Sequence, residues 1–452
     1  MSTEGPNHEA TLLSQELCSF ISECPSPFHT VRAIGERLER AGFLRLSEVD
    51  SWRIERGGRY YTTRNDSSII ALRVGEHVDV PCFRMVSSHS DSPTYKVKDV
   101  PELEGPGAYV RINVEGYGGL IDRTWLDRPL SIAGRVLVQD KDVLRSYLIA
   151  PSEDLLLIPS VAIHQDREVN KGGALNRQID MCPLFSAGEL GQGGFGAMVA
   201  QALGVDPERI MGHDLMLVNR QPAVVWGAAG EFVSGPRLDD LQCAHASLQA
   251  FLQTSDEQGI CVYTCLNNEE VGSGTMQGAL STFVPQTLRR ICDGLASEDG
   301  LCASTDLYAR ALARSLLVSC DNAHAVHPNH PELYDTNNRV WLNQGVVIKE
   351  SAAQRYTTDA VSRSVFKLLC RRADVPVQAF ANRSDSPGGS TLGNLLVRNA
   401  SMSAVDVGLP QLAMHSSYET AGVLDTFYLL RALREFYDTP LQFCADGSIA
   451  IG

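Results

Sequence analysis

The sequence contains no long hydrophobic run. No apolar stretch in its 452 residues approaches the ~18 residues that a membrane-spanning helix needs. The first ten residues, MSTEGPNHEA, have no basic segment followed by an apolar one, so they do not have the pattern of a secretory signal. From these two absences we expect a cytoplasmic protein that does not act on a membrane.

Paired cysteines and an excess of positive charge are also missing. The 12 cysteines are scattered, and no two of them have the CxxC spacing of zinc-binding cysteine pairs. We therefore expect buried, reduced thiols rather than a disulfide framework. Lys and Arg total 39 against 54 Asp and Glu, so the net charge is −15. This balance argues against nucleic acid or an anionic membrane as the main partner.

The composition is that of an ordinary globular protein, and the chain is longer than a domain with a single hydrophobic core usually is. Hydrophobic residues make up 44% of the chain and charged residues 21%, so the chain can bury a sizeable core. A chain of 452 residues predicts two domains, or one large domain with an insertion.

The sequence pattern changes twice along the chain. Before residue 97 and after residue 235, helical stripes alternate with apolar runs, which indicates a sheet covered on both faces. Between these points, short alternating runs punctuated by Gly and Pro indicate antiparallel strands with a helix or two. We predict a three-layer α/β/α domain from 1–96 and 236–452, interrupted by a β-rich domain at 97–235. The main expected elements are helices at 9–23, 28–41, 238–254, 357–372 and 421–437, and strands at 82–87, 259–266, 314–320 and 405–407.

Residues that can bind metal follow four of the predicted strands. Open α/β sheets bind ligands beyond the carboxyl ends of their strands, so these side chains could converge at one edge. His and carboxylate ligands suit Zn²⁺ or Mn²⁺. The residues are His89, Asp91, Glu269, Glu270, Asp321 and His415.

The number of these ligands suits two metal ions with a separate base. Two histidines and three carboxylates hold two ions if one carboxylate bridges them. Two ions roughly 3.5–4 Å apart can activate a water and polarise a carbonyl. One further carboxylate must stay off the metals to take the proton of that water, and adjacent Glu269 and Glu270 supply a base and a ligand. The spacing of His89 and Asp91 is typical of a ligand whose ring is oriented by a neighbouring carboxylate.

Each of these features also has an ordinary structural interpretation. A histidine after a strand is often a surface or core residue, and a Glu pair is usually solvated. Asp239 and Asp240, which precede a helical stripe, match a helix N-terminus. The GxGxxG pattern at 191–196 has no strand directly before it, so we interpret it as a flexible loop that opens a helix at Ala197 rather than a nucleotide site. On spacing alone, the metal site and the ordinary interpretations both stay open.

Five motifs occur in order along the chain. They are Ser-His-Ser-Asp-Ser-Pro (88–93), Pro-Arg-Leu-Asp-Asp-Leu (236–241), Asn-Glu-Glu-Val-Gly-Ser (268–273), Asp-Asn-Ala-His-Ala-Val-His-Pro-Asn (321–329) and Gln-Leu-Ala-Met-His-Ser (411–416). Together they resemble the M18 peptidase family, the aspartyl aminopeptidases, over nearly the whole chain. The resemblance implies a zinc-peptidase fold of the phosphorylase/hydrolase type.

The resemblance also implies a role for each matched position. It implies two divalent ions per subunit, most readily Zn²⁺, with Mn²⁺ and Co²⁺ as alternatives. Asp91 is expected to orient a ligand, and Asp240 to stand beside the bridging carboxylate. The expected ligands and base are His89 and Asp321 on one metal, Asp239 as the bridge, Glu270 and His415 on the second metal, and Glu269 as general base.

Substrate contacts and assembly are implied in the same way. His324 and Tyr356 are expected against the substrate, and Lys349 against an acidic side chain of its first residue. His164 is expected to reach the active site of a neighbouring subunit. Family members assemble as tetrahedral dodecamers built from dimers, which implies a dimer-contact and lid role for the inserted domain.

The expected reaction is the removal of N-terminal residues, preferentially Asp or Glu, from peptides with a free N-terminus. A metal-bridged hydroxide attacks the carbonyl, and Glu269 is the general base. Two alternatives stay open. One is a broad or neutral aminopeptidase, or a related two-metal deacylase. The other is a non-catalytic scaffold, against which the sequence argues because the base and all five ligand positions are intact.

Overall fold

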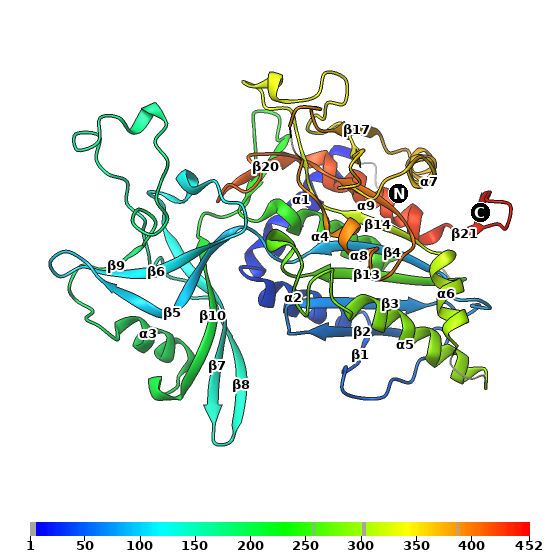
Figure 1. Ribbon diagram of the computed structural model, residues 1–452, viewed down its shortest axis with the longest axis horizontal. Coiled ribbons are helices and arrows are strands. Elements are labelled where there is room, and N and C mark those ends of the chain that lie inside the picture. The colour runs from blue at the N-terminus through cyan, green and yellow to red at the C-terminus, as the bar shows by residue number, and fades with distance from the viewer. Residues whose placement is uncertain (1–5, 256–257, 301–303, 387) are drawn as a thin grey trace.

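The computed structural model describes residues 6–255, 258–300, 304–386 and 388–452. Figure 1 shows two bodies, a large sheet covered by helices and a smaller, mainly antiparallel sheet beside it. The predicted α/β fold class is confirmed. In the described residues, no helix is long and apolar enough to cross a membrane.

The large sheet has nine strands in the order β1-β2-β3-β13-β4-β14-β18-β16-β17. Its four central strands, β13, β4, β14 and β18, are parallel neighbours, so their carboxyl ends lie at the same edge. The strands are β1 (Leu44–Arg45), β2 (Arg59–Arg64), β3 (Ser68–Val74), β4 (Phe83–His89), β13 (Ile260–Leu266), β14 (Leu316–Cys320), β16 (Val346–Glu350), β17 (Val377–Ala381) and β18 (Ser403–Gly408).

Helices cover both faces of this sheet because its central strands are apolar on both sides. Along β13, Cys261 and Tyr263 face one hydrophobic cluster, and Ile260 and Val262 face the other. The first cluster is covered by α1 (Pro6–Glu23), α2 (Pro27–Arg40), α4 (Leu238–Gln253), α7 (Ala360–Arg372) and α9 (Val423–Asp438). The second is covered by α5 (Phe283–Glu298), α6 (Thr305–Ala313) and α8 (Leu392–Leu396).

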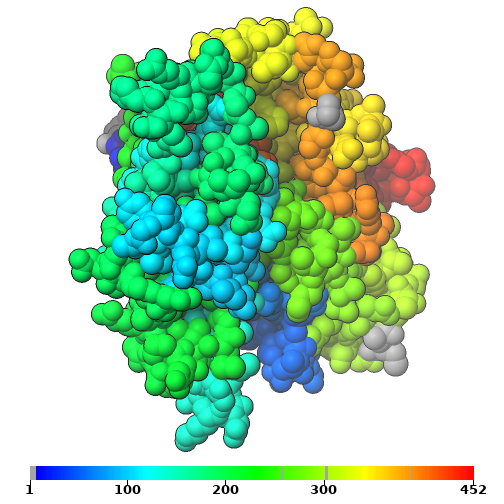
Figure 2. All heavy atoms as spheres, turned by 60° about the vertical axis from the view of Figure 1, so that its left-hand side comes forward, coloured from blue at the N-terminus to red at the C-terminus, as the bar shows by residue number. Residues whose placement is uncertain are grey.

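The second sheet has six strands in the order β8-β7-β10-β5-β6-β9 and a hydrophobic cluster of its own. Its neighbouring strands are antiparallel, as the alternating runs predict. In Figure 2 its cyan-to-green residues form one side of the molecule. The elements are β5 (Thr94–Glu104), β6 (Val110–Tyr117), β7 (Leu130–Asp140), β8 (Val143–Ile149), β9 (Leu184–Ser186), α3 (Gly194–Leu203) and β10 (Ile210–Asn219).

A five-stranded sheet connects the end of the predicted insertion with the C-terminal part of the chain. It contains β11 (Val224–Trp226), β12 (Phe232–Gly235), β15 (Ala323–His324), β19 (Pro410–Leu412) and β20 (Glu419–Gly422). Because β12 pairs with β20, the last residues before 236 pack with C-terminal strands rather than with the six-stranded sheet. The domain division at 97 and 235 stays a prediction. A hairpin of β21 (Leu441–Phe443) and β22 (Ile449–Ile451) ends the chain.

The GxGxxG segment opens a helix, but three residues earlier than predicted. Helix α3 starts at Gly194 instead of Ala197. The Glu102 carboxylate accepts hydrogen bonds from the amides of Gly193 (2.5 Å) and Phe195 (2.6 Å). Since a carboxylate of the same chain already occupies the helix N-terminus, this segment offers no open phosphate site.

Candidate two-metal centre

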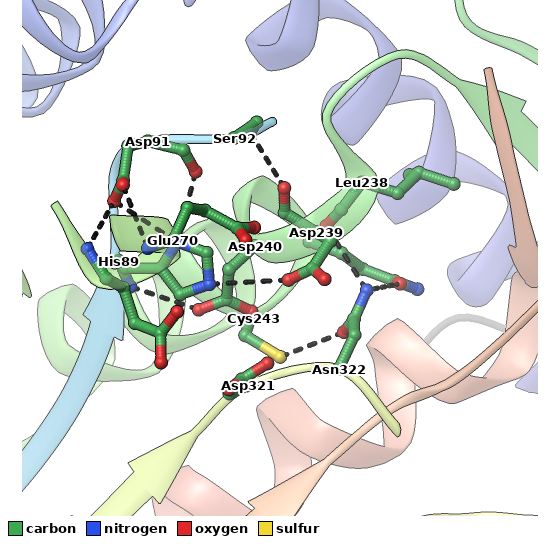
Figure 3. A network of polar contacts seen from close by, with 12 residues as sticks. His89, Asp91, Ser92, Leu238, Asp239, Asp240, Cys243, Glu270, Asp321 and Asn322 are labelled. Carbon is green, nitrogen blue, oxygen red and sulfur yellow. Dashed lines mark hydrogen bonds and ion pairs between the residues drawn. The ribbon is translucent and has the colours of Figure 1, made fainter. Parts of the chain in front are cut away.

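The predicted metal-binding side chains converge beyond the carboxyl ends of the central strands (Figure 3). The strand ends are close because β4, β13 and β14 are adjacent, and the first turn of α4 adds two more carboxylates. Five segments contribute: His89 at the end of β4, Asp239 and Asp240 in α4, Glu269 and Glu270 after β13, Asp321 after β14, and His415 after β19.

The ligand atoms form two groups that share one residue. His89, Asp239, Asp240 and Asp321 have ligand atoms within 4.8 Å of one another, and so do Asp239, Glu270 and His415. Asp239 Oδ1 lies 3.3 Å from Nε2 of His89, and Asp239 Oδ2 lies 3.5 Å from Nε2 of His415. A carboxylate with one oxygen toward each group has the arrangement that a bridge between two ions requires.

Buried carboxylate oxygens without hydrogen bonds show that these residues fit metal ions. Within the described residues, Oδ1 of Asp239, Oδ1 of Asp240 and Oε1 of Glu270 are buried and accept no hydrogen bond. Buried polar atoms almost always have a partner, and clustered carboxylates repel one another. A divalent cation gives the buried oxygens a partner and offsets the repulsion between the carboxylates. This mixture of histidine and carboxylate suits Zn²⁺.

Asp240 belongs to this cluster although no ligand role was predicted for it. Its Oδ2 accepts a hydrogen bond from the backbone amide of His89 at 3.1 Å. Asp240 thereby fixes the end of β4 relative to the start of α4. The sequence motif predicts only that Asp240 stands beside Asp239. Its contact with the end of β4 depends on how α4 packs against the sheet.

The cluster shifts the pKa values of its members strongly. Burial raises the pKa of Glu269 to about 8 and raises that of Glu270 well above its usual range. Burial opposes the charge of His415, but Asp239 and Glu270 outweigh it and raise the pKa of the imidazole to about 10. Burial likewise opposes the charge of His89, yet Asp240 and Asp239 hold its pKa well above the usual value.

Zinc binding is expected to release more than one proton per subunit at pH 7. Histidine must be neutral to bind a metal, and the raised pKa values mean that His89 and His415 are both protonated before zinc arrives. Zinc affinity should therefore fall as the pH is lowered, by roughly tenfold per pH unit for each proton displaced. Calorimetric titration of metal-free protein in two buffers of different ionisation enthalpy measures this number. Release of no protons would contradict the expectation.

Asp91 contacts both a predicted ligand and the predicted base. The Nδ1–H of His89 donates to the backbone carbonyl of Asp91 at 3.0 Å, while the nearer carboxylate oxygen lies 3.5 Å away. The carboxylate itself accepts hydrogen bonds from the backbone amides of Glu269 and Glu270, each at 3.2 Å. Asp91 therefore joins the His89 ring to the bend that carries the two glutamates.

Glu419 is a site residue that sequence reasoning missed. Its side chain is 1% exposed, and its carboxylate accepts hydrogen bonds from the amides of Asp239 (3.0 Å) and His415 (2.7 Å). It thus fixes the bridging carboxylate and the second histidine relative to each other. The only signal in the sequence is a Glu four residues after His415, which is also ordinary in a strand.

Lys349 and Tyr356 lie deep beside the cluster. Lys349 in β16 is 3% exposed; its Nζ donates to the carbonyl of Asn322 at 2.8 Å and lies 3.7 Å from Oδ1 of Asp321. Its ammonium also faces the buried ring of Tyr356, 5.6 Å from the centroid. Lys349 is therefore paired with a predicted metal ligand, Asp321.

The two other predicted substrate residues differ in position. His324 in β15 is exposed, yet the protein that surrounds its ring and then the charge of Lys349 lower the pKa of its imidazole to about 4, so it is neutral at pH 7. His164 is exposed on the loop between β8 and β9. Among the described residues, no hydrogen bond or ion pair joins His164 to the cluster.

A helix-covered sheet whose strand ends hold two carboxylate–histidine groups bridged by one aspartate defines a candidate two-metal hydrolase. The family described as "Aminopeptidase I zinc metalloprotease (M18)" matches residues 20–437. The chain belongs to the M18 family, so it is an aminopeptidase and a hydrolase of peptides.

Curated relatives and solved structures agree with this membership. The "Probable M18 family aminopeptidase 2" of Clostridium novyi is 41% identical over 94% of this chain and 98% of its own length. Its namesake in Pseudomonas paraeruginosa is 40% identical over 94% and 98%.

Among solved structures, one chain of the cryo-EM structure of the Ape4 and Nbr1 complex is 34% identical, with a TM-score of 0.91 over 97% of this chain and 87% of that chain. The mApe1 of Chaetomium thermophilum is 30% identical, with a TM-score of 0.86 over 96% and 98%. The mApe1 dodecamer of S. cerevisiae is 26% identical, with a TM-score of 0.81 over 95% and 97%.

Proposed function

We propose that this protein is a two-metal aminopeptidase that removes N-terminal residues, preferentially Asp or Glu, from peptides. One observation carries the proposal. Asp239 directs its two oxygens toward two different histidines, His89 and His415, as a bridge between two ions requires. Glu269 stands next to the proposed ligand Glu270 without belonging to either ligand group.

The residues that would hold the metals divide into two sets. His89, Asp239 and Asp321 would hold one ion, and Asp239, Glu270 and His415 the other. Zn²⁺ suits this set, and the family model that the chain matches is described as a zinc metalloprotease; Mn²⁺ and Co²⁺ are the alternatives. When bound, the ions would acidify a water and polarise the carbonyl of the scissile bond.

Glu269 then performs the proton transfers of the reaction. Its carboxylate accepts a proton from the attacking water and passes it to the nitrogen of the leaving peptide. The hydrogen bond from its amide to Asp91 fixes the bend from which it acts.

The activity is tested with a peptide series and its blocked counterparts. Zinc-loaded protein is expected to release the first residue from peptides with a free α-amine, and not from the same peptides after N-acetylation. N-acyl amino acids serve as substrates for the alternative, a two-metal deacylase. Cleavage of acyl amino acids without cleavage of peptides would reject the aminopeptidase, and activity that survives full removal of metal would reject the metal mechanism.

The second candidate function is an aminopeptidase that accepts many kinds of first residue, and the burial of Lys349 favours it. An ammonium that already pairs with Asp321 and the Asn322 carbonyl is less available to a substrate carboxylate. The acidic preference requires that Lys349 also reach the first side chain of the substrate. The two candidates predict different effects of neutralising this lysine.

Lys349→Met is expected to lower kcat/KM for Asp and Glu substrates about tenfold more than for Leu and Ala substrates, since only the acidic side chains lose a charged partner. The ratio is the informative quantity because loss of the Asp321 pair affects every substrate equally. Aminoacyl-arylamide assays with measured zinc content provide it. The matched control is Lys367→Met, at an exposed position of α7. Equal losses on all four substrates would favour the broad aminopeptidase.

We propose further that the protein forms a homo-oligomer, a tetrahedral dodecamer built from dimers through the segment 97–235, with that segment also acting as a lid. The solved S. cerevisiae dodecamer supports the assembly. The exposed position of His164 is compatible with contact with a neighbouring subunit. The scattered cysteines support a cytoplasmic location. Light scattering of purified protein tests the assembly directly.

A further inference from the structure

The six-stranded sheet reaches the metal cluster through one tyrosine. Tyr117 is the last residue of β6, and its hydroxyl donates a hydrogen bond to Oδ2 of Asp91 at 2.7 Å. The same hydroxyl accepts a hydrogen bond from Nδ2 of Asn268 at 2.9 Å. Tyr117 therefore contacts both Asp91, which accepts the amide hydrogens of Glu269 and Glu270, and Asn268, which directly precedes them.

Both contacts lead directly to the proposed base. Asp91 is 1% exposed, and its two carboxylate oxygens also accept the amide hydrogens of Glu269 and Glu270 at 3.2 Å. Asn268 immediately precedes Glu269 and has a φ of 63°, a left-handed conformation that starts the bend. Without the Tyr117 hydroxyl, the Asp91 carboxylate loses its only side-chain hydroxyl donor among the described residues, and the Asn268 amide loses an acceptor.

The surrounding backbone is fitted closely to this contact. A Cβ at Gly118 would lie 3.1 Å from Cβ of Glu270, and one at Gly119 would lie 3.2 Å from Nδ1 of His415, so two glycines let the loop approach both proposed ligands. The amide of Ile121 donates to the carbonyl of His415 at 3.1 Å. The end of β6 and the loop that follows it thus contact the site over several residues.

The strand pairing fixes Tyr117 relative to Asp91. Thr94, which begins β5 three residues after Asp91, is the register partner of Tyr117 on β6. Burial, and then the Asp91 charge, raise the pKa of the Tyr117 phenol above its usual value. The hydroxyl therefore keeps its proton at neutral pH and donates a hydrogen bond to Asp91. A buried hydrogen bond to a carboxylate is among the strong ones.

We propose that Tyr117 is a positioning residue for peptide hydrolysis: through Asp91 and Asn268, it sets the position of the Glu269 carboxylate. This inference rests on the proposed function of Glu269. It makes the six-stranded sheet part of the catalytic apparatus of its own subunit. A displacement of β6 relative to β4 is transmitted to the base through two hydrogen bonds.

The test is kinetic analysis of Tyr117→Phe in the full-length, zinc-loaded protein. The variant removes one oxygen and keeps the ring. We expect kcat per zinc-loaded site to fall roughly 10- to 100-fold, as for loss of a buried hydrogen bond to a charged group, with KM within about twofold and zinc content unchanged. A purely structural role would instead lower the melting temperature or the zinc content and leave kcat per loaded site unchanged; that result would overturn the proposal.

A second variant and a control complete the experiment. Asn268→Gly keeps the left-handed backbone and deletes the side chain that contacts Tyr117, so it is expected to lower kcat as well; it also tests the proposal if Tyr117→Phe does not fold. Combined with Tyr117→Phe, its effect should be less than additive because both variants remove the Tyr117–Asn268 hydrogen bond; the hydrogen bonds that Asn268 Oδ1 accepts from Thr275 and Gln277 are lost only in Asn268→Gly. Tyr109→Phe, at an exposed tyrosine beside β6, is the matched control.

Two outcomes separate this inference from the proposed function. If Glu269→Gln is inactive while Tyr117→Phe and Asn268→Gly equal the wild type, only the positioning inference fails. If Glu269→Gln retains full activity, the proposed function of Glu269 fails.

Discussion

Glu269→Gln is expected to lower kcat by roughly 10²–10⁴-fold while both zinc sites stay filled. The amide has nearly the same shape as the carboxylate but cannot accept a proton from the attacking water. Its amide hydrogen bond to Asp91 is made by the backbone, so the substitution leaves the bend in place. Steady-state kinetics and metal analysis on the same sample measure both quantities.

Two controls make the Glu269 result specific. Glu208→Gln changes the same functional group at an exposed position just before β10 and should leave kcat unchanged. Glu270→Gln changes the adjacent proposed ligand and should lower zinc content as well as kcat. Wild-type turnover by Glu269→Gln would reject its assignment as the base, and loss of zinc would assign it to the ligand set.

Asp239→Ala is expected to abolish high-affinity binding of both ions and, with it, all measurable turnover. Each of its oxygens faces a different histidine, so one substitution removes a ligand from both proposed sites. Asp321 belongs to only one group, so Asp321→Ala should lose one ion and retain the other. Zinc stoichiometry after equilibrium dialysis distinguishes the two variants.

The stability of the metal-free proteins provides an independent measurement. Without zinc, the charges and hydrogen bonds of His415 and His89 hold the pKa of Asp239 below its usual value although burial opposes its charge. Its removal leaves two buried imidazolium rings without their shared partner, so metal-free Asp239→Ala should melt below metal-free wild type. Zinc should raise the melting temperature of the wild type much more than that of the variant, because only ligands that bind the folded state stabilise it. Retention of two tightly bound ions by Asp239→Ala would contradict the bridging role.

Local pattern predicted most elements around the site. The apolar run at 259–266 became β13 (Ile260–Leu266), and the stripe at 238–254 became α4 (Leu238–Gln253). Buried strands and amphipathic helices have periodicities that a few residues reveal. The start of α3 was less predictable, because the Glu102 carboxylate that accepts from its N-terminal amides is about 90 residues away in the chain.

The site residues that could be predicted from the sequence are those that directly follow a strand and belong to a short motif. His89, Glu270 and Asp321 each stand within a few residues of a strand end, and parallel strands bring such ends together. Tyr117 and Glu419 had no comparable signal. They act through hydrogen bonds to residues far away in the sequence, and a lone Tyr or Glu in a strand has many ordinary explanations.

The order of residues was sufficient to indicate the fold class and the metal-binding residue types, because both depend on local periodicity and on short motifs. The environment of each side chain depends on long-range pairing, which is set by packing of the whole chain. Only the folded structure puts Asp239 between two histidines, turns Lys349 toward Asp321 rather than outward, and brings Tyr117 from a second sheet against the carboxylate of Asp91.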